Sequence, residues 1–299
     1  MRGADVLFRS DNVAVARGGL EPGDPRWATD QINDAPPCVS FPTRAVRVEK
    51  EGMEPFVAST NRVSLFNHDQ AFRVRRVGPL GTRSIRFYYN PAAVADAFGV
   101  CACWTDDPTK PFPVSSAVIG HRTFLAHRAV DLLVHNDPDP LLVEELALQI
   151  LHDTADAIDR TPGPPRASAR TREAHQEAVR AVESCIAQRF GERLTLGAFG
   201  KAACCAPTHL CRIYRAYTGI SIHQSLTRHR VRRAAEMLSI AGHDSSSVAR
   251  DCGFSSRSHL SDTMHRALGV RPSDLRPAGR AARILRDHIA QQPDGRAQN

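Results

Sequence analysis

The sequence predicts an α+β protein with an N-terminal β-barrel, two helices after it, and a C-terminal all-α domain of two helix-turn-helix units joined by a long helix. Short β-type runs between residues 38 and 88 predict the barrel. A Pro-rich segment, TPGPPRASAR, marks the domain boundary, and helical periodicity dominates beyond it. The expected boundaries are 1–160 for the first domain, 161–171 for the linker, 172–280 for the helical domain and 281–299 for a tail.

Length and composition fit a two-domain chain. With 299 residues and 42% hydrophobic side chains, it can fill two ordinary cores. It contains no apolar run of about 18 residues, and its first residues, MRGADVLFRSDN, lack the apolar segment of a signal peptide. We therefore expect a cytoplasmic protein with no membrane contact.

Positive charge is concentrated in the C-terminal half. Residues 170–280 hold 18 Arg or Lys against 9 Asp or Glu, whereas residues 1–169 hold 18 against 21. A basic domain attached to a near-neutral one is typical of nucleic-acid binding coupled to another activity. The charge distribution therefore predicts a nucleic acid as a partner, and the helix-turn-helix units described below make double-stranded promoter DNA the expected one.

The N-terminal domain divides into three stretches. Residues 1–35 are rich in Gly, Pro and Asp and predict an irregular arm. Two helices are expected at 115–136 and 139–159, and their apolar faces would pack on the barrel or on a second copy of the chain. A homodimer is therefore left open. The strands predicted between the arm and the helices are 45–48, 62–66, 71–75 and 84–88.

A helix-turn-helix is predicted at 251–276, which reads DCGFSSRSHLSDTMHRALGVRPSDLR. Gly253 supplies a turn that tolerates positive φ, and Ser255 or Ser256 can cap the helix that follows. The N-terminal turn of such a second helix contacts base edges in DNA. The apolar residues of this helix recur at a spacing of four, at Leu260, Met264 and Leu268.

A copy of this segment lies fifty residues earlier. Ser221 and Gln224 form a capping box between the copies, ahead of a helix with apolar residues at helical spacing. Two units tied by one connecting helix are therefore predicted. The alignment of THLCRIYRAYTGI with SHLSDTMHRALGV places His209, Leu210 and Gly219 on His259, Leu260 and Gly269.

The second unit contains G-F-S-S-x-S-H-[FL] and G-V-x-P-S-x-[YL]-R. Two units tied by one helix and carrying these motifs resemble the DNA-binding domain of the AraC/XylS family of bacterial transcription regulators, over about residues 172–280. The resemblance implies base-reading roles, and an Arg can bind guanine through two hydrogen bonds or contact phosphate instead. The implied residues are Thr208, Cys211 and Arg212 in the first unit and Arg257, Ser258 and Ser261 in the second, with His209 and His259 expected to touch phosphate or to pack.

The first unit departs from the family pattern. Cys204 stands where a turn Gly is usual, Ala206 stands where a Ser cap is usual, and Gly200 lies inside the first helix. A lost cap and a helical Gly each cost about 1 kcal/mol. Ser225 and His229 replace an aromatic and an aliphatic residue in the connecting helix. We therefore expect looser packing in the first unit than in the second.

The segment FVASTNRVSLFNHDQAFRVRRVGPLG is similar to the cupin-like sensory domain of some AraC-type regulators. This resemblance implies a cupin-like barrel that binds a small-molecule effector. Catalytic cupins hold a metal with a His-x-His pair, a Glu and a later His. Here the strands offer only His68, and the spacing of His121 and His127 points them in different directions on a helix. No enzyme activity, metal or cofactor is expected.

The cysteines provide no zinc-finger spacing. In a cytoplasmic protein they are most often small buried hydrophobic residues, which we expect of Cys185, Cys205 and Cys252. Redox or metal sensing by Cys101 and Cys103 is left open.

The leading hypothesis is a sequence-specific DNA-binding transcription regulator. Its N-terminal domain would respond to a small molecule or a partner, and family habit favours an activator, with RNA polymerase as a further candidate partner. One alternative is a cupin-like metal-dependent enzyme with an incidental helical tail. Another is an architectural helical protein without sequence preference.

Overall fold

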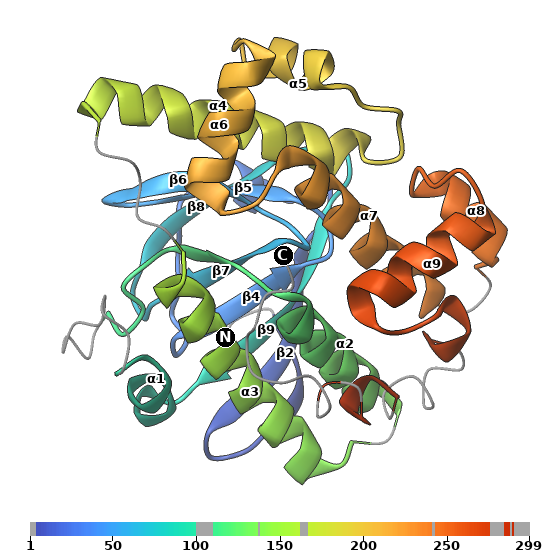
Figure 1. The fold of residues 1–299 in the computed structure, drawn as a ribbon. Helices are drawn as coiled ribbons and strands as arrows, with labels where there is room; N and C mark the ends of the chain where they lie inside the picture. Colours follow the sequence, from blue (N-terminus) through green and yellow to red (C-terminus); the bar gives the residue numbers. More distant parts are fainter. Residues whose placement is uncertain are drawn as a thin grey trace.

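The computed structural model describes residues 4–99, 110–136, 138–161, 167–240, 243–275, 284–287 and 289. The N-terminal strands form two antiparallel sheets, and the C-terminal helices lie along one side of them (Figure 1). The six-stranded sheet contains, in spatial order, β1 (Asp5–Arg9), β2 (Val13–Leu20), β9 (Thr82–Tyr89), β4 (Cys38–Pro42), β7 (Arg62–Phe66) and β10 (Ser116–Val118). The four-stranded sheet contains β3 (Gln31–Ile32), β8 (Ala71–Arg76), β5 (Val46–Lys50) and β6 (Met53–Ala58).

The two sheets do not close into the barrel that the sequence predicts. Closure requires continuous pairing around the ring. The edges here are β1 and β10 on one sheet and β3 and β6 on the other, and within the described residues no ladder joins the two sheets. Two of these edge strands are only two and three residues long. The mixed helix and sheet class is confirmed, and the closed barrel is wrong.

The six-stranded sheet is buried on both faces, as its alternation shows. Ile85, Phe87 and Tyr89 on β9 pack in the core that includes the N-terminal helices, whereas Tyr88 packs in a second core between the sheets. Arg86 faces the same inter-sheet space as Tyr88, because successive side chains of a strand point to opposite faces.

The irregular arm expected for residues 1–35 is also wrong, because this stretch contains β1, β2 and β3. Strand β2 pairs with β9 along its whole length, from Val13↔Tyr89 to Leu20↔Thr82. Its sequence, VAVARGGL, hides the strand because Ala and Gly are weak strand formers. A Cβ on Gly19 would lie 2.7 Å from the Thr82 carbonyl oxygen, so the pairing requires a glycine there.

The helices α1 (Pro91–Phe98), α2 (His121–Asn136) and α3 (Pro140–Asp159) pack on the outer face of the six-stranded sheet. Helix α2 begins later than predicted, because Ser116–Val118 pairs with β7 instead. Asp139 caps α3 by accepting from the amides of Leu141 and Leu142. The apolar residues of α3 that fill this core are Val143, Leu146, Ala147, Ile150 and Leu151.

Among the described residues, the C-terminal half is helical apart from short connections. Helix α4 begins at Ala169, inside the segment expected as a linker, with Ser168 as its cap. Among the described helices, none combines the length and the hydropathy needed to cross a membrane. The helices are α4 (Ala169–Arg189), α5 (Leu196–Ala202), α6 (Pro207–Thr218), α7 (Ile222–Leu238), α8 (Ser245–Asp251) and α9 (Arg257–Leu268), followed by a 3-10 turn at Pro272–Leu275.

Helix α7 lies between the two helix-turn-helix units (Figure 1). The core of the second helix-turn-helix unit, which includes Leu260 and Met264, belongs to the same hydrophobic cluster as Phe124 and Leu125 of α2. The first unit has a separate core built around Phe199, Leu210 and Tyr214. The two units are therefore attached to the N-terminal domain in different ways.

Candidate nucleic-acid interface

The two helix-turn-helix turns close with the same pattern of three backbone hydrogen bonds. In the first unit, Ala203 N donates to Phe199 O (2.9 Å), Cys204 N to Lys201 O (3.3 Å) and Cys205 N to Gly200 O (2.9 Å). In the second unit, Cys252 N donates to Val248 O (2.9 Å), Gly253 N to Arg250 O (3.0 Å) and Phe254 N to Ala249 O (2.8 Å). The internal repeat therefore extends to the backbone geometry of the turn.

The residues that build these turns differ. The left-handed position is Gly253 in the second unit, with φ of 74°, and Cys204 in the first, with φ of 47°. Gly200 has a packing role that the sequence analysis counted only as a cost. A Cβ there would lie 2.8 Å from the Cys205 carbonyl oxygen, so a glycine allows the turn to approach α5.

Helix α9 begins with a full set of cap interactions. Of the two serines that the sequence offers as caps, the structure uses Ser256, whose Oγ accepts from the His259 amide at 3.0 Å. The His259 ring accepts at Nδ1 from the Ser255 hydroxyl and packs edge-on against Phe254. Arg257 is exposed in the same turn, and within the described part of the chain no hydrogen bond or ion pair holds its side chain.

Helix α6 begins without a side-chain cap. Ala206 provides none, and Pro207 occupies the first turn. Arg212 is exposed, and its Nη2 lies 2.9 Å from His209 Nδ1. Cys211 is half-buried and packs against the core of the first unit. This turn is therefore open to solvent but held less firmly than that of α9.

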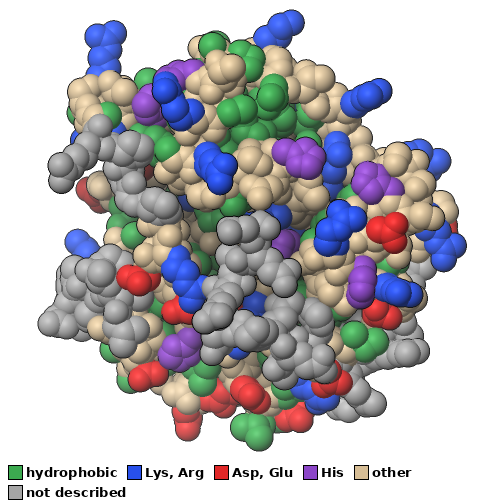
Figure 2. Space-filling model, viewed as in Figure 1, with side chains coloured by type: hydrophobic (Ala, Val, Ile, Leu, Met, Phe, Trp, Pro, Cys, Tyr) green, Lys and Arg blue, Asp and Glu red, His purple; other side chains and the backbone are tan. Residues whose placement is uncertain are grey.

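The eight predicted site residues lie in two groups, one on α6 and one on α9. Cys211 and Ser261 are half-buried, and the others are exposed: Thr208, His209, Arg212, Arg257, Ser258 and His259. Basic side chains project from the upper and right parts of the molecule, over the C-terminal domain, while acidic ones gather below the N-terminal helices (Figure 2).

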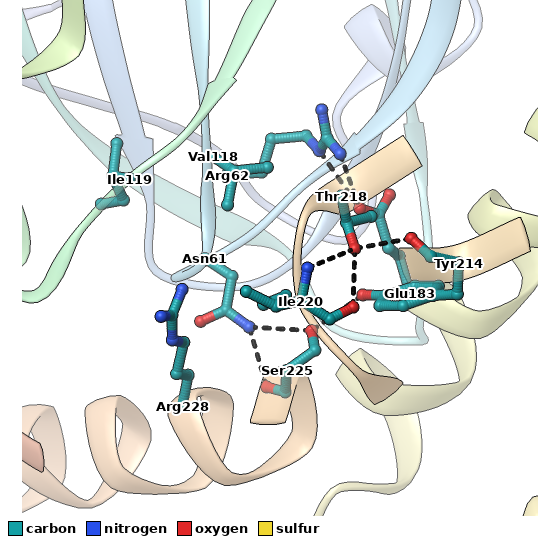
Figure 3. A pocket seen from close by; sticks show the side chains of 10 residues that line it. All are labelled: Asn61, Arg62, Val118, Ile119, Glu183, Tyr214, Thr218, Ile220, Ser225 and Arg228. Atoms are coloured by element: carbon teal, nitrogen blue, oxygen red, sulfur yellow. Dashed lines mark hydrogen bonds and ion pairs between the residues drawn. The ribbon is translucent and has the colours of Figure 1, made fainter. Parts of the chain in front are cut away.

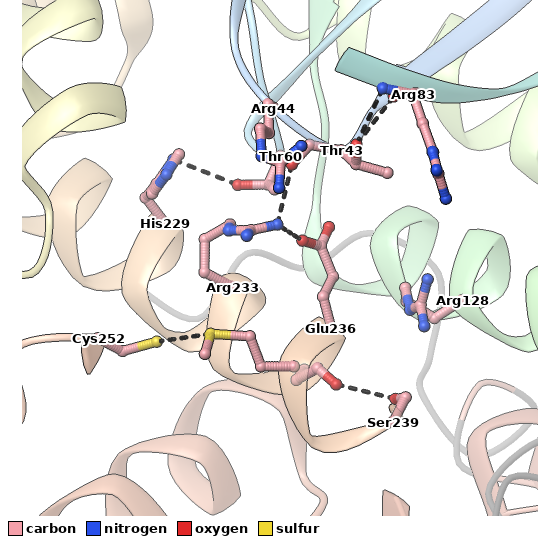
Figure 4. A network of polar contacts seen from close by, with 12 residues as sticks. Thr43, Arg44, Thr60, Arg83, Arg128, His229, Arg233, Glu236, Ser239 and Cys252 are labelled. Carbon is pink, nitrogen blue, oxygen red and sulfur yellow. Dashed lines mark hydrogen bonds and ion pairs between the residues drawn. The ribbon is translucent and has the colours of Figure 1, made fainter. Parts of the chain in front are cut away.

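The connecting helix α7 carries the predicted capping box. Ser221 Oγ accepts from Gln224 N at 3.1 Å, and Gln224 Oε1 accepts from Ser221 N at 2.8 Å. The loose packing expected at Ser225 is not observed, because Tyr214 donates to its hydroxyl at 2.8 Å and Asn61 donates to its carbonyl at 3.0 Å (Figure 3). His229 is likewise buried, and its Nδ1 lies 3.3 Å from the Thr60 hydroxyl (Figure 4).

Sequence reasoning missed the most deeply buried basic side chain in the contact between α7 and the N-terminal domain. Arg232 on α7 is 0% exposed, and its guanidinium stacks 5.1 Å from the centre of the Phe124 ring. Burial lowers its pKa to about 9. Its hydrogen bonds all go to oxygen atoms of the N-terminal domain: Thr60 O at 2.7 Å, Gly120 O at 2.8 Å, Ile119 O at 3.0 Å and Asn61 Oδ1 at 3.2 Å.

Polar contacts also join α4 to the strands. Arg62 Nη2 lies 2.9 Å from Glu183 Oε1, and Arg180 Nη1 donates to Pro55 O at 3.2 Å. At the C-terminal end of α4, Arg230 of α7 donates to the carbonyls of Phe190 and Glu192 at 2.7 Å each. The first unit therefore reaches the N-terminal domain mainly through hydrogen bonds and ion pairs.

The described residues contain no group of three or more His, Cys, Asp or Glu that could hold a metal ion. His68 lies near the surface beside Asp69. His127 is buried and stacks on Phe41 at 4.3 Å, and burial lowers its pKa to about 3. Of the cysteines, Cys185 and Cys252 are buried and Cys205 is half-buried, while Cys101 and Cys103 lie outside the described residues.

Residues 199–278 match the family model described as "Helix-turn-helix domain". A curated relative, "Probable transcriptional regulator LumQ" of Photobacterium leiognathi, is 26% identical over 92 residues. These cover 31% of this chain and 37% of that protein, so the match spans little more than a third of the relative's length.

Solved structures similar to this chain include a transcriptional regulator from Chromobacterium violaceum described as containing an AraC-type DNA-binding domain. It is 24% identical, with a TM-score of 0.33, and the match covers 36% of this chain and 94% of that one. ToxT from Vibrio cholerae O395 is 9% identical with a TM-score of 0.33, covering 89% of this chain and 97% of ToxT. The likeness is low in both cases, so the assignment of the C-terminal domain rests on the family model.

Proposed function

We propose that the whole chain is a sequence-specific DNA-binding transcription regulator with an AraC-type DNA-binding domain, since residues 199–278 match the helix-turn-helix family model. The observation that carries this proposal is the pair of units held on α7, each of which exposes the polar N-terminal turn of its second helix. That turn is the part of a recognition helix that meets base edges. One chain would then contact two successive major grooves, about 34 Å apart.

Arg212 and Arg257 are the proposed guanine readers, because a guanidinium can donate two hydrogen bonds to one guanine. Both are exposed, one on each recognition helix. The hydroxyls of Thr208 and Ser258 would contact bases or backbone beside them. Cys211 and Ser261 are half-buried on the same helices, and we propose that they also contact base edges.

His209 and His259 are proposed phosphate contacts. An arginine N–H donates to Nδ1 of His209, and Ser255 N lies 3.5 Å from Nδ1 of His259 as a donor. Each neutral ring therefore carries its proton on Nε2. An Nε2–H that points away from the helix is a suitable donor to a phosphate oxygen.

The two helices would read different sequences. Asp262 in α9 occupies the position that Arg212 holds in α6, and both side chains are exposed. A carboxylate accepts from a cytosine amino group and repels phosphate, whereas Arg prefers guanine. The proposed site is therefore an asymmetric pair of half-sites.

The N-terminal domain is proposed to sense a small molecule or a partner. Its loops hold Arg232 and His229 of α7, the helix that sets the spacing of the two recognition helices. A change in the N-terminal domain would thus reach both units through one helix. An activator that contacts RNA polymerase in the cytoplasm fits the family resemblance. A homodimer would need a surface other than the apolar faces of α2 and α3, which are buried within the chain.

The test is selection of binding sites from random-sequence DNA with the full-length protein, followed by footprinting on the enriched sequence. We expect one enriched asymmetric site and protection over two successive major grooves. Arg212→Ala and Arg257→Ala should weaken binding to this site, whereas Arg83→Ala, at the exposed start of β9, should leave it unchanged.

Two outcomes would overturn the proposal. Binding without any enriched sequence, unaffected by both substitutions, would favour an architectural protein. Stoichiometric metal in the purified protein together with substrate turnover would favour the cupin-like enzyme.

A further inference from the structure

A cavity of about 50 Å³ lies between the two sheets of the N-terminal domain. One wall is apolar and comes from the four-stranded sheet, through Val46, Val48, Phe72 and Val74. The opposite wall belongs to the six-stranded sheet and is polar at its centre. No Asp or Glu is among the described residues that line the cavity.

The polar wall is a row of three side chains on adjacent strands. Ser40 on β4 pairs with Arg86 on β9 on one side and with Ser64 on β7 on the other. Ser40 is 7% exposed and Ser64 is 3% exposed. Both side chains line the cavity, and no hydrogen bond of either hydroxyl is found within the described part of the chain. The row therefore presents two unused donors to the cavity.

Arg86 supplies a lasting positive charge at the end of this row. Its guanidinium lies against Gly18 on the neighbouring strand, where a Cβ would come within 3.2 Å of Cζ. Its Nε donates to Ser84 Oγ at 3.2 Å, and Tyr88 is its other polar neighbour. Within the described residues no carboxylate forms an ion pair with it, and Asp34, whose charge reaches Tyr88, is exposed.

The other basic side chain between the two sheets, Lys50, already has hydrogen-bond partners. Lys50 Nζ donates to the carbonyls of Leu65 and Ser115 and lies 4.0 Å from the centre of the Phe66 ring. Arg86 is thus the charged group that faces the cavity with most of its donors free.

We propose that this cavity binds a compact monocarboxylate, whose carboxylate accepts hydrogen bonds from Arg86, Ser40 and Ser64 and whose apolar body packs against the opposite sheet. A planar guanidinium and a carboxylate form a geometrically matched pair. The size of the cavity sets the limit, since one water needs about 10–15 Å³ of such space and the cavity holds the equivalent of about four. As the effector, this carboxylate rests on the proposed regulator function.

The test is titration calorimetry and thermal denaturation of the full-length protein with sodium carboxylates from acetate to hexanoate, each compared with its primary amide. We expect the carboxylates to bind and to raise the melting temperature, with affinity rising along the series until the cavity is full, and the amides not to bind. Arg86→Met should weaken binding by about 10-fold to about 100-fold, because it removes charge-assisted hydrogen bonds.

Two variants sharpen this result. Arg83→Met removes an exposed arginine from the same strand and should leave the affinity unchanged. Gly18→Ala should weaken binding without removing any polar group, because its methyl group displaces the guanidinium. Near-ultraviolet circular dichroism of each variant checks that the sandwich is intact.

The proposal is overturned if no carboxylate of the series binds, if amides bind as well as carboxylates, or if Arg86→Met keeps the affinity. Sulfate binding as tightly as the best carboxylate would also overturn it, since the site would then be a simple oxyanion site. DNA binding is measured separately with the selected sequence. Loss of carboxylate binding with DNA recognition retained refutes only the cavity assignment, whereas carboxylate binding without DNA recognition refutes only the regulator.

Discussion

The first and second helix-turn-helix units share their backbone hydrogen bonds but differ in how they are anchored. The first unit has its own core and reaches the N-terminal domain through polar contacts such as Arg62–Glu183 and the hydrogen bonds of Ser225. The second unit shares one hydrophobic cluster with α2 and α3. Polar contacts depend on protonation and ionic strength, whereas apolar burial depends on shape. The two units should therefore respond to different perturbations.

The turns show the same contrast on a smaller scale. A Cβ on Gly253 would lie 2.9 Å from the carbonyl oxygens of Phe190 and Gly191, so only glycine fits. Cys204 takes up the equivalent left-handed conformation with a side chain in place and lies at the surface. Where neighbouring atoms leave no room for a Cβ, the left-handed backbone conformation requires glycine. At the surface, a residue with a side chain can adopt the same conformation at the cost of some backbone strain.

Acid should have the largest effect. His229 at the interface and His127 in the core are buried, and burial lowers the pKa of each to about 3. The unfolded chain takes up protons near pH 6.5, so stability is full above that pH and falls as the pH drops towards 3. Each histidine contributes about 1.4 kcal/mol per pH unit. Urea unfolding between pH 7.5 and 5 measures this loss.

Replacing a buried histidine tests this assignment. His229→Gln should reduce the slope of stability against pH, because a buried ring that resists protonation is gone. A flat profile in the wild-type protein would show that the buried histidines take up protons in the folded state as readily as in the unfolded chain.

Loss of Arg232 should come next in size. Arg232→Met keeps much of the side-chain volume but leaves three carbonyls and the Asn61 amide oxygen without their donor. Unsatisfied buried acceptors cost about 1–3 kcal/mol each, and water that enters beside some of the four replaces their lost donor, so we expect a net loss of about 3 kcal/mol. Chemical denaturation gives this value, with Arg266→Met on the exposed face of α9 as the control. If the two variants were equally stable, Arg232 would not stabilise the contact between α7 and the N-terminal domain.

The turn glycine should matter more than its counterpart. Gly253→Ala places a methyl group against two carbonyl oxygens at a φ of 74° and should cost about 2–3 kcal/mol. Cys204→Gly relieves the equivalent strain in the first unit and should gain up to about 1 kcal/mol. Thermal denaturation of both variants orders the effects, and a tolerated Gly253→Ala would mean that the second turn can shift away from α4.

The better-capped unit should carry more of the DNA specificity. A lost bidentate contact to guanine costs about 1–3 kcal/mol. We expect Arg257→Ala to approach the upper value and Arg212→Ala the lower one, because Arg212 already contacts His209. Titration of each variant against the selected DNA and against single-base changes tests this order. Equal losses, or the reverse order, would show that the first unit reads as much of the site.

The cap difference should give the smallest effect. Ala206→Ser supplies the side-chain oxygen that α6 lacks and should stabilise the first unit by about 0.5–1 kcal/mol. Ser256→Ala removes the bond to the His259 amide and should cost about 1 kcal/mol. Urea denaturation measures both, and a destabilising Ala206→Ser would show that Pro207 has already fixed the entry into α6.

Two features were not predicted from the sequence, each for a physical reason. They are the strands β1 and β2 and the polar contacts between α7 and the N-terminal domain. In β2, small residues supply no strand signal, and only the pairing with β9 fixes the segment. The interface residues Ser225, His229 and Arg232 look like ordinary polar positions of a helix, because their partners are backbone atoms of distant loops. Polar contacts to a backbone leave no pattern of matching residues in the sequence.

The sequence by itself determined the local features of the C-terminal domain. The repeated turn, a serine cap at Ser255 or Ser256 and the capping box of Ser221 and Gln224 lie within single helical turns, where a residue three positions away is the partner. The tertiary structure decided that the sheets stay open, that α7 carries a buried arginine against the N-terminal loops, and that Arg86 faces a cavity with no acid among its described lining residues. These depend on which strands and loops meet in space, because burial and pairing between distant segments are set by packing rather than by local preference.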